Sequence, residues 1–539
     1  MRKYVIFPLL AGWGLLAASC YDDKSTLQTT DIPKVQIEVP EAIASELTVV
    51  HNAQLDVTGI KITKDGKTNP EGLTYEWTVS QTANDSQPSL LATTEEFHEV
   101  IDLPISSAGY LFLLTVTDPE YDLRYQYKWT LYVTAQYNEG VVVAYTTDGT
   151  TSDLGLVMHP QLTFKYAGSD QGMVKKDLIR AANENPFPSL VTHLLYTYDK
   201  TDLRNMLWVS TDDDLMRVET DYYGILGHRD DAFVYLPDAL DVRQIINTYQ
   251  CTMLLNNGDI YETLLSRTRI STPVTGTETM TVDNNVVSAH SAPGSTRKPS
   301  TIFYDNVQEK FCYGHNTAFY ACASDASGAF NPGAAPGLRC LAGGISIDNA
   351  THTLLMRNEN IAGSDDSKYK IYTFSNYSAS AGSPAAKLVY KIPEEANARI
   401  DEAVAFFFSR LDPVLYIVTR SGIYKTIFEA GAVIFDPVPV FEAPAGEHIT
   451  LARLYVQGYY ALENYDGSAS VAGNATQAWS SRAVIVVTSK DDMNDKLHIV
   501  PQINYGSGQL DTAHELVFDG FGRILDFTVA GLYGQTAKK

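Results

Sequence analysis

Met253-Leu254-Leu255-Asn256-Asn257-Gly258-Asp259-Ile260-Tyr261 reads as an apolar strand, a polar turn containing glycine, and an apolar return strand that ends in tyrosine. The same order recurs over Leu415–Tyr424, where Ser421-Gly422 forms the end of the turn. A glycine turn between two short apolar runs is typical of a β-hairpin. The recurrence of one hairpin far along the chain predicts an architecture of repeated antiparallel sheets.

Two looser copies of the hairpin extend the repeat. They occupy residues 207–216 and residues 484–500. The intervals between Trp208, Leu254, Tyr416 and Ile485 are 46, 162 and 69 residues, and 162 is three steps of about 54. Residues 137–539 therefore predict a β-propeller-like domain of about 58 residues per blade, which gives seven blades. Two or three unrelated β-sandwiches are the alternative.

The composition favours an all-β protein and excludes a nucleic-acid partner. Tyrosine occurs 33 times against nine methionines, and charged residues make up only 19% of the chain. This balance suits pleated sheets better than helical bundles. The net charge of −24 repels phosphate backbones, so we expect no binding to nucleic acid.

Residues 33–136 predict one immunoglobulin-like β-sandwich. Apolar and polar residues alternate from Val35 onward, and Lys64-Asp65-Gly66-Lys67 contains the Asp-Gly signal of a tight hairpin. Within residues 73–79, alternation places Tyr75, Trp77 and Val79 on one face. A tryptophan at this position of a strand is typical of the space between two sheets.

The N-terminus carries the features of an export signal. Residues 1–19 combine a basic start, an apolar stretch too short to span a membrane, and a run of small residues before Cys20. This arrangement resembles the lipobox of bacterial lipoproteins, which implies a lipidated Cys20 and a tether over residues 20–32. Asp22 and Asp23 resemble the surface-export signal of Bacteroidota lipoproteins. An ordinary signal peptide is the alternative.

The lipobox region together with Tyr75-Glu76-Trp77 resembles the PKD-like lipoproteins of Bacteroidota. The resemblance covers about the first quarter of the chain. It implies an N-terminal PKD-like sandwich and a location at the outer membrane, where a lipid anchor holds the protein facing the medium. It also implies a SusC/SusD-type importer complex as the partner, because genes of the family often lie beside such importers. Trp77 runs into Thr78-Val79-Ser80 rather than into the acidic turn of a typical PKD domain.

The remaining cysteines leave the disulfide state open. Besides Cys20, the chain contains Cys251, Cys312, Cys322 and Cys340. Export permits disulfides, and Cys312 is close enough in sequence to Cys322 or Cys340 to pair with either. Buried free thiols are the equal alternative.

Sequence motifs for catalysis, metals and cofactors are missing. No two of the 11 histidines fall within four positions, so the spacings of zinc hydrolases do not occur, and we expect neither a metal nor a cofactor. No catalytic residues can be named, because a pair of acids cannot be selected from 64 acidic residues.

One loop region is a candidate ligand-binding surface. Trp479 ends a long stretch rich in Gly, Ser and Ala, and Tyr459, Tyr460 and Tyr465 precede it. These rings could form a stacking platform for a sugar or a peptide side chain. The alternative is that Trp479 folds back over the edge of a blade.

Two functions remain. The first is a non-catalytic surface lipoprotein that binds a nutrient, either glycan or peptide, or docks on the importer as an accessory subunit. The second is a surface glycoside hydrolase or lyase with its active site in the propeller, since propellers gather residues from distant blades. The missing catalytic spacings favour the first.

Overall fold

The computed structural model describes residues 34–68, 70–81, 87–163, 166, 168–199, 204–247, 252–263, 269–270, 287–288, 301–315, 318–324, 328–346, 350–360, 367–376, 382–456, 479–503 and 506–531. The chain divides into two compact units, Met1–Val133 and Thr134–Lys539. Both units are built from β-strands, as the composition predicts. No described helix is long and apolar enough to cross a membrane.

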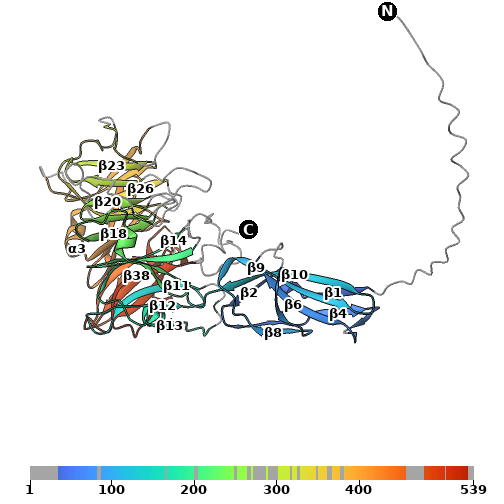
Figure 1. Cartoon of the computed structure of the whole chain (residues 1–539). Coiled ribbons are helices and arrows are strands. Elements are labelled where there is room, and N and C mark those ends of the chain that lie inside the picture. Colours follow the sequence, from blue (N-terminus) through green and yellow to red (C-terminus); the bar gives the residue numbers. More distant parts are fainter. Residues whose placement is uncertain are drawn as a thin grey trace, which may run out of the picture. The chain divides into compact units, whose positions relative to one another are not determined.

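The first unit contains three antiparallel sheets among its described residues (Figure 1). The five-stranded sheet has the order β2 (Glu46–Val50), β10 (Leu123–Thr134), β9 (Ser106–Asp118), β6 (Thr74–Ser80) and β7 (Ser89–Ala92). A three-stranded sheet has the order β1 (Val35–Glu38), β4 (Lys61–Lys64) and β5 (Lys67–Thr68). A two-stranded sheet pairs β3 (Gln54–Val57) with β8 (Phe97–Val100). The short helix η1 (Glu41–Ile43) follows β1.

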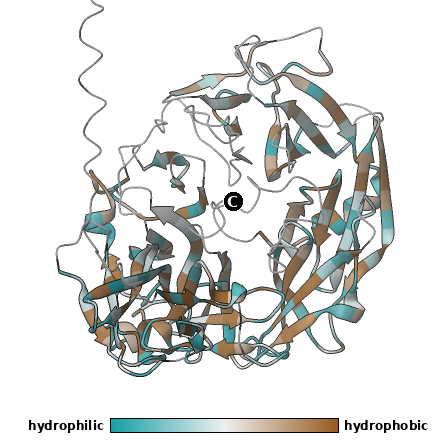
Figure 2. Ribbon diagram, turned by 90° about the vertical axis from the view of Figure 1, so that its right-hand side faces the viewer, coloured by the Kyte–Doolittle hydropathy of each residue, from teal (hydrophilic) through white to brown (hydrophobic). Residues whose placement is uncertain are grey.

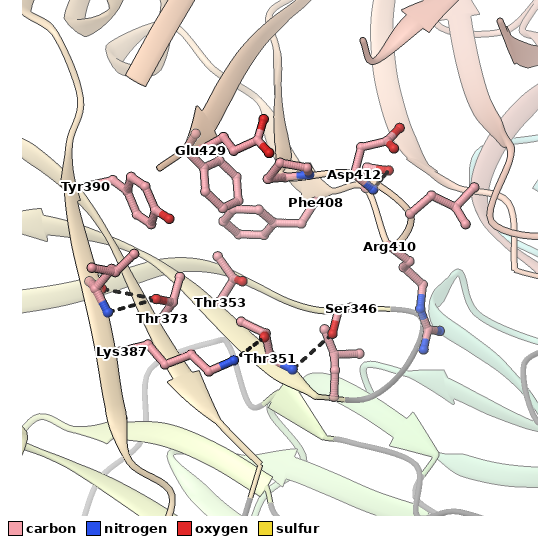
Figure 3. A pocket seen from close by; sticks show the side chains of 16 residues that line it. Ser346, Thr351, Thr353, Thr373, Lys387, Tyr390, Phe408, Arg410, Asp412 and Glu429 are labelled. Atoms are coloured by element: carbon pink, nitrogen blue, oxygen red, sulfur yellow. Dashed lines mark hydrogen bonds between the residues drawn. The ribbon is translucent and has the colours of Figure 1, made fainter. Parts of the chain in front are cut away.

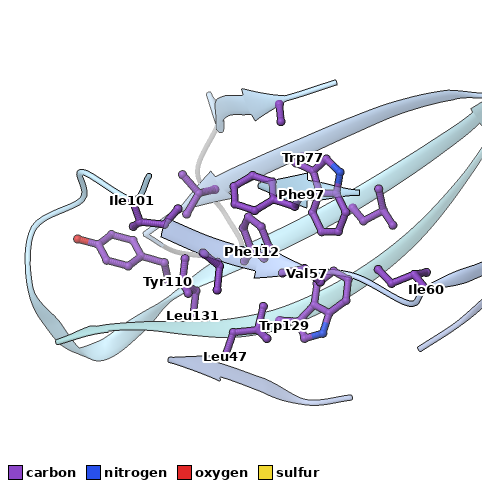
Figure 4. Packing of buried hydrophobic residues seen from close by; sticks show 14 of the residues in the cluster. Leu47, Val57, Ile60, Trp77, Phe97, Ile101, Tyr110, Phe112, Trp129 and Leu131 are labelled. Atoms are coloured by element: carbon purple, nitrogen blue, oxygen red, sulfur yellow. The ribbon is translucent and has the colours of Figure 1, made fainter. Parts of the chain in front are cut away.

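Stacked aromatic rings fill the core of this unit (Figure 4). Trp77 of β6 is fully buried, as the alternation predicts, and its ring centroid lies 5.3 Å from Phe112 and 5.6 Å from Trp129. Phe97 of β8 packs 5.3 Å from Trp77 on another side. The indole nitrogens of Trp77 and Trp129 donate to the carbonyl oxygens of Thr94 and Ile43, at 2.8 and 2.6 Å. All three sheets therefore share one core, whose polar ring atoms are satisfied.

The second unit contains seven antiparallel sheets among the described residues, here called sheets 1 to 7. Sheet 1 is β38 (Arg523–Ala530), β11 (Gly140–Thr146), β12 (Asp153–Met158), β13 (Met173–Lys175); sheet 2 is β14 (Val191–Asp199), β15 (Arg204–Thr211), β16 (Leu215–Glu219), β17 (Ile225–Gly227); sheet 3 is β18 (Val242–Asn247), β19 (Thr252–Asn256), β20 (Asp259–Glu262). Sheet 4 is β21 (Val287–Ser288), β22 (Thr301–Asp305), β23 (Lys310–His315), β24 (Ala318–Ala321); sheet 5 is β25 (Leu338–Ile345), β26 (Thr351–Asn358), β27 (Tyr369–Ser375), β28 (Ala386–Lys391). Sheet 6 is β29 (Ala405–Phe408), β30 (Val414–Val418), β31 (Gly422–Glu429), β32 (Ala432–Glu442); sheet 7 is β33 (His448–Leu454), β34 (Ala483–Ser489), β35 (Lys496–Ile503), β36 (Gln509–Leu510), β37 (Leu516–Phe518). The short helices are α1 (Leu178–Asn183), α2 (Arg229–Ala232), η2 (Glu394–Ala396), α3 (Asn397–Asp401) and η4 (Thr512–His514).

The seven sheets close into a ring (Figure 2). β11, near the start of the unit, pairs with β38 at its end, so that Val143 lies opposite Phe527. Separate hydrophobic clusters join each sheet to the next, and Val143 packs in the cluster that joins sheet 1 to Ile485 of sheet 7. Consecutive small sheets around a centre, closed by pairing of the two chain ends, form a β-propeller.

The predicted hairpins occupy equivalent places in this ring. The stretch from Met253 to Tyr261 forms β19 and β20, and Asn257 and Gly258 at the turn have positive φ angles of 50° and 82°. The stretch from Leu415 to Tyr424 falls on β30 and β31, and the looser copies fall on β15–β16 and β34–β35. All four are the second and third strands of sheets 2, 3, 6 and 7. The three-step interval is therefore confirmed, because two sheets lie between sheets 3 and 6.

Candidate functional site

A pocket of about 380 Å³ lies between sheets 5 and 6 (Figure 3). It opens where β25 turns into β26, β27 leads to β28, and β29 turns into β30. A volume of this size lies within the range of small-ligand sites, which is roughly 300–1,000 Å³. The residues that line it are Ile345, Ser346, Thr351, Thr353, Thr373, Lys387, Leu388, Tyr390, Phe408, Ser409, Arg410, Leu411, Asp412, Pro413, Phe428 and Glu429.

Three aromatic rings form an apolar part of the lining. The ring of Phe428 lies 5.3 Å from Tyr390 and 5.9 Å from Phe408, in edge-to-face contacts. All three residues are buried and belong to the cluster that joins sheets 5 and 6. Because the rings are packed on several sides, they present a rigid apolar surface to whatever enters the pocket.

Hydroxyl groups on sheet 5 form a polar part of the lining. Lys387 Nζ donates to Thr351 Oγ1 at 2.8 Å, and the backbone N–H of Thr351 donates to Ser346 Oγ at 2.9 Å. Thr373 Oγ1 accepts from the Leu388 N–H at 3.1 Å, beside the register shift between β27 and β28. The strands thus hold these side chains in fixed positions before any ligand arrives.

The loop between β29 and β30 contributes charged groups of both signs. Hydrogen bonds from Ser409 N to Val414 O (2.9 Å) and from Asp412 N to Ser409 Oγ (3.3 Å) fix its backbone. Asp412 lies on the same side of the pocket as Glu429, whereas Arg410 extends to the side of Ser346 (Figure 3). Burial lowers the pKa of Arg410 to about 10.

The first strands of the sheets, β38, β14, β18, β21, β25, β29 and β33, carry one carboxylate among their described side chains, Asp526. Asp526 is buried and pairs with Arg453 of β33, while its Oδ2 accepts from the Leu194 N–H at 2.7 Å. His193 of β14 lies nearby, and burial lowers the pKa of its imidazole. Glycoside hydrolysis usually requires two carboxylates, so these strands do not provide a pair for it within the described part of the chain.

The residues predicted from sequence do not line this pocket. Trp479 is partly buried and packs against the cluster between sheets 7 and 1. Tyr459, Tyr460 and Tyr465 lie outside the described residues, as do Cys20, Asp22 and Asp23. The roles predicted for these seven residues stay predictions.

Of the two possibilities that the sequence leaves open for Cys312, Cys322 and Cys340, the structure has the second: all three are buried thiols outside any disulfide. Cys312 packs between sheets 3 and 4, whereas Cys322 and Cys340 pack between sheets 4 and 5. Cys322 follows β24 and its N–H donates to Phe311, the residue before Cys312 on β23. Since successive residues of a strand face opposite sides, Cys312 points away from the other two. Burial raises the pKa of the Cys312 thiol to about 12.

Sequence reasoning missed the pocket residues because no motif marks them. They come from several separate turns between Ile345 and Glu429, and only the packing of sheet 5 against sheet 6 brings them together. The one local signal was Ser409-Arg410-Leu411-Asp412-Pro413, a polar and charged turn between two buried strands. Charged residues at a turn are usually exposed to solvent, so the presence of Arg410 and Asp412 in this turn does not by itself indicate a binding site.

Comparison with known proteins gives no family. No family model matches the chain, and no curated protein matches it. A quinonprotein alcohol dehydrogenase-like protein from Bacteroides thetaiotaomicron is similar in structure with a TM-score of 0.38 and 12% identity, over 93% of this chain and 99% of that one. The β-propeller domain of Cps50 (Swd1) from Myceliophteria thermophila gives 0.33 and 9%, over 61% and 86%. Likeness at this level carries no information on function, and the propeller assignment rests on the sheet order and the ring of cores.

Proposed function

We propose that this chain is a non-catalytic lipoprotein, anchored at the outer membrane through Cys20, that binds a nutrient glycan or peptide at the pocket between sheets 5 and 6. The observation that carries the proposal is the combination of a rigid apolar surface with hydroxyl and charged groups in one pocket. Such a combination suits ligands that have both an apolar face and many polar substituents. The lipobox-like N-terminus and the resemblance to PKD-like lipoproteins support the location.

The proposal includes a finer description of the architecture. The first unit is a PKD-like or immunoglobulin-like sandwich that acts as a spacer above the lipid anchor. The seven sheets are the seven blades of the propeller, which acts as the recognition module. Docking on a SusC/SusD-type importer as an accessory subunit would deliver the bound nutrient for uptake.

The competing function is a glycoside hydrolase or lyase, and the carboxylates of the propeller bear on it. Asp526 is held by Arg453 and by the Leu194 N–H, so it is occupied by structural contacts. Asp412 and Glu429 both line the pocket, but the hydroxyls and Lys387 opposite them fit ligand binding equally well.

A matched pair of variants tests binding at the pocket. Lys387 and Lys391 are both exposed on β28, but only Lys387 lines the pocket. We expect Lys387→Ala to weaken binding of saccharides or peptides by about ten- to a hundredfold, because it removes a charged hydrogen bond of roughly 1.5–3 kcal/mol. Lys391→Ala should leave binding unchanged. Titration calorimetry of the full chain in detergent measures both, and equal effects of the two variants would contradict a site at this pocket.

Co-purification tests whether the chain docks on an importer. We expect a tag placed after Lys539 to recover a large β-barrel importer and its lid lipoprotein from detergent-solubilised outer membrane. Recovery of this chain alone would contradict the docking role, and release of shortened products from a saccharide incubated with the chain would favour the hydrolase.

A further inference from the structure

Arg410 is a cation without a partner. The Nε and Nη2 atoms of its guanidinium are buried and form no hydrogen bond. Burial alone lowers its pKa, and no acidic side chain in the described part of the chain offsets that effect. A guanidinium has five N–H donors and stays charged at neutral pH, so burying two of its nitrogens without a hydrogen-bond partner is unfavourable.

Two arginines elsewhere in the propeller are paired with acidic side chains. Arg453 pairs with Asp526, and Arg357 pairs with Glu359 through both Nε and Nη2. Unbonded buried guanidinium nitrogens are exceptions among the described arginines: Arg410 has two, its Nε and Nη2, and lines a pocket, whereas Arg217 has one, its Nε. Such exceptions concentrate at binding sites, where a ligand supplies the missing charge.

The surroundings of Arg410 suit a negatively charged group. Figure 3 shows Ser346, Thr351 and Lys387 on the same side of the pocket as Arg410. Thr351 Oγ1 accepts its hydrogen bond from Lys387 Nζ, so its own hydroxyl hydrogen can be donated to a ligand. Two cations and a hydroxyl donor thus line this side of the pocket, and such groups are the usual partners of anions in proteins.

The opposite side of the pocket suits sugar hydroxyls. Asp412 and Glu429 lie there, away from the guanidinium of Arg410 (Figure 3). Carboxylates accept hydrogen bonds from hydroxyl groups and repel a second anion. The rings of Tyr390 and Phe408 provide the apolar surface between the two sides.

We propose that the pocket between sheets 5 and 6 binds an acidic sugar, whose carboxylate or sulfate group pairs with Arg410 and Lys387. The sugar hydroxyls donate to Asp412 and Glu429, and the apolar face of the ring packs on the aromatic side chains. The inference rests on the proposed binding function and narrows its ligand to an anionic saccharide rather than a peptide.

Titration of the full chain with matched ligands tests the charge requirement. The probes are trigalacturonate, its methyl ester, a sulfated galactotriose, neutral galactotriose and triglutamate. We expect trigalacturonate or the sulfated sugar to bind at least tenfold more tightly than the ester and the neutral sugar. The preferred one of the two identifies the anion as a carboxylate or a sulfate.

Two variants test whether Arg410 is responsible for the preference for a negatively charged ligand. Arg410→Gln should remove the difference between trigalacturonate and its methyl ester, whereas the control Arg357→Gln, which removes an arginine outside the pocket, should keep it. Because Arg410 has no partner to lose, Arg410→Gln should melt at the same temperature as the wild-type chain or higher. Saturating acidic sugar should raise the melting temperature of the wild type and not of the variant.

The other possible results each contradict a different part of the proposal. Equal binding of charged and neutral sugars at the pocket would overturn the acidic ligand and leave the proposed function standing. Binding of triglutamate but of none of the sugars would contradict the inference that the ligand is a saccharide. A large fall in melting temperature for Arg410→Gln would show that Arg410 is structural, and no binding of any probe would contradict the inference and the proposed function together.

Discussion

Asp526 shows how one carboxylate joins three sheets around the centre of the propeller. From β38 it pairs with Arg453 of β33 and accepts the N–H of Leu194 on β14. Arg453 also donates to the carbonyl oxygen of Phe527 at 3.2 Å. These contacts lie where the last strand of the chain enters sheet 1, so they stabilise the closure of the ring.

His193, beside this group, predicts how stability depends on pH. Its Nε2 lies 3.1 Å from the carbonyl oxygen of Arg243, its Nδ1 is buried without a hydrogen bond, and burial lowers its pKa. The unfolded chain, with an ordinary histidine pKa of about 6.5, therefore binds a proton at a higher pH than the folded chain does. The free energy of unfolding should fall as the pH drops below about 6.5.

The variant His193→Gln isolates this effect, since glutamine keeps a neutral donor and cannot be protonated. We expect the melting temperature to fall less between about pH 7 and pH 5 in the variant than in the wild type. Melting curves at several pH values measure both. An identical pH dependence would mean that His193 is not held neutral by the fold.

Gly344 of β25 governs how closely this strand approaches Phe408 of β29, which lines the pocket. A Cβ atom at this position would lie 2.5 Å from Cβ and 2.9 Å from Cδ2 of Phe408, far closer than atoms can pack. Gly344→Ala must therefore displace Phe408, and we expect a loss of about 1–3 kcal/mol in the free energy of unfolding. Ligand affinity should fall with it, because Phe408 lines the pocket.

Gly224→Ala is the matched control. Its Cβ would meet only Glu219 Oε1, at an ordinary 3.5 Å. Denaturant unfolding of both variants gives the comparison. Unchanged stability and affinity in Gly344→Ala would show that sheets 5 and 6 can separate without disturbing the pocket.

The elements that sequence could predict are those encoded by neighbouring residues. Asn257-Gly258 and Asp65-Gly66 supply the positive φ angles that tight hairpins require, so the hairpins were visible before the structure. Trp77 was predictable as a core residue because alternation along β6 fixes its face. The pocket was not, because Thr351, Lys387 and Arg410 meet only after two separate sheets have packed together.

At the scale of the whole molecule, each unit has a hydrophobic core of its own. Trp77→Ala should remove about 3–5 kcal/mol from the free energy of unfolding of the first unit, because it leaves a large cavity among Phe97, Phe112 and Trp129. The propeller has separate cores between its sheets and should be unaffected. Scanning calorimetry of the full chain should show one transition moving to lower temperature and another staying in place.

Equal shifts of all transitions in Trp77→Ala would instead show that the two units unfold as one. That result would contradict the description of the first unit as an independent spacer. Saccharide affinity of the same variant provides a second check, since a spacer contributes nothing to the pocket and its weakening should leave affinity unchanged.

The central claim is that the pocket between sheets 5 and 6 is where this protein holds its ligand. Hydrogen–deuterium exchange of the full chain, with and without saturating neutral and acidic trisaccharides, tests it most directly. The account predicts slower exchange in residues 345–346, 351–353, 387–390 and 408–413, with no change in the strands of the first unit. Protection at another surface, or none at these segments while a ligand is bound, would contradict it.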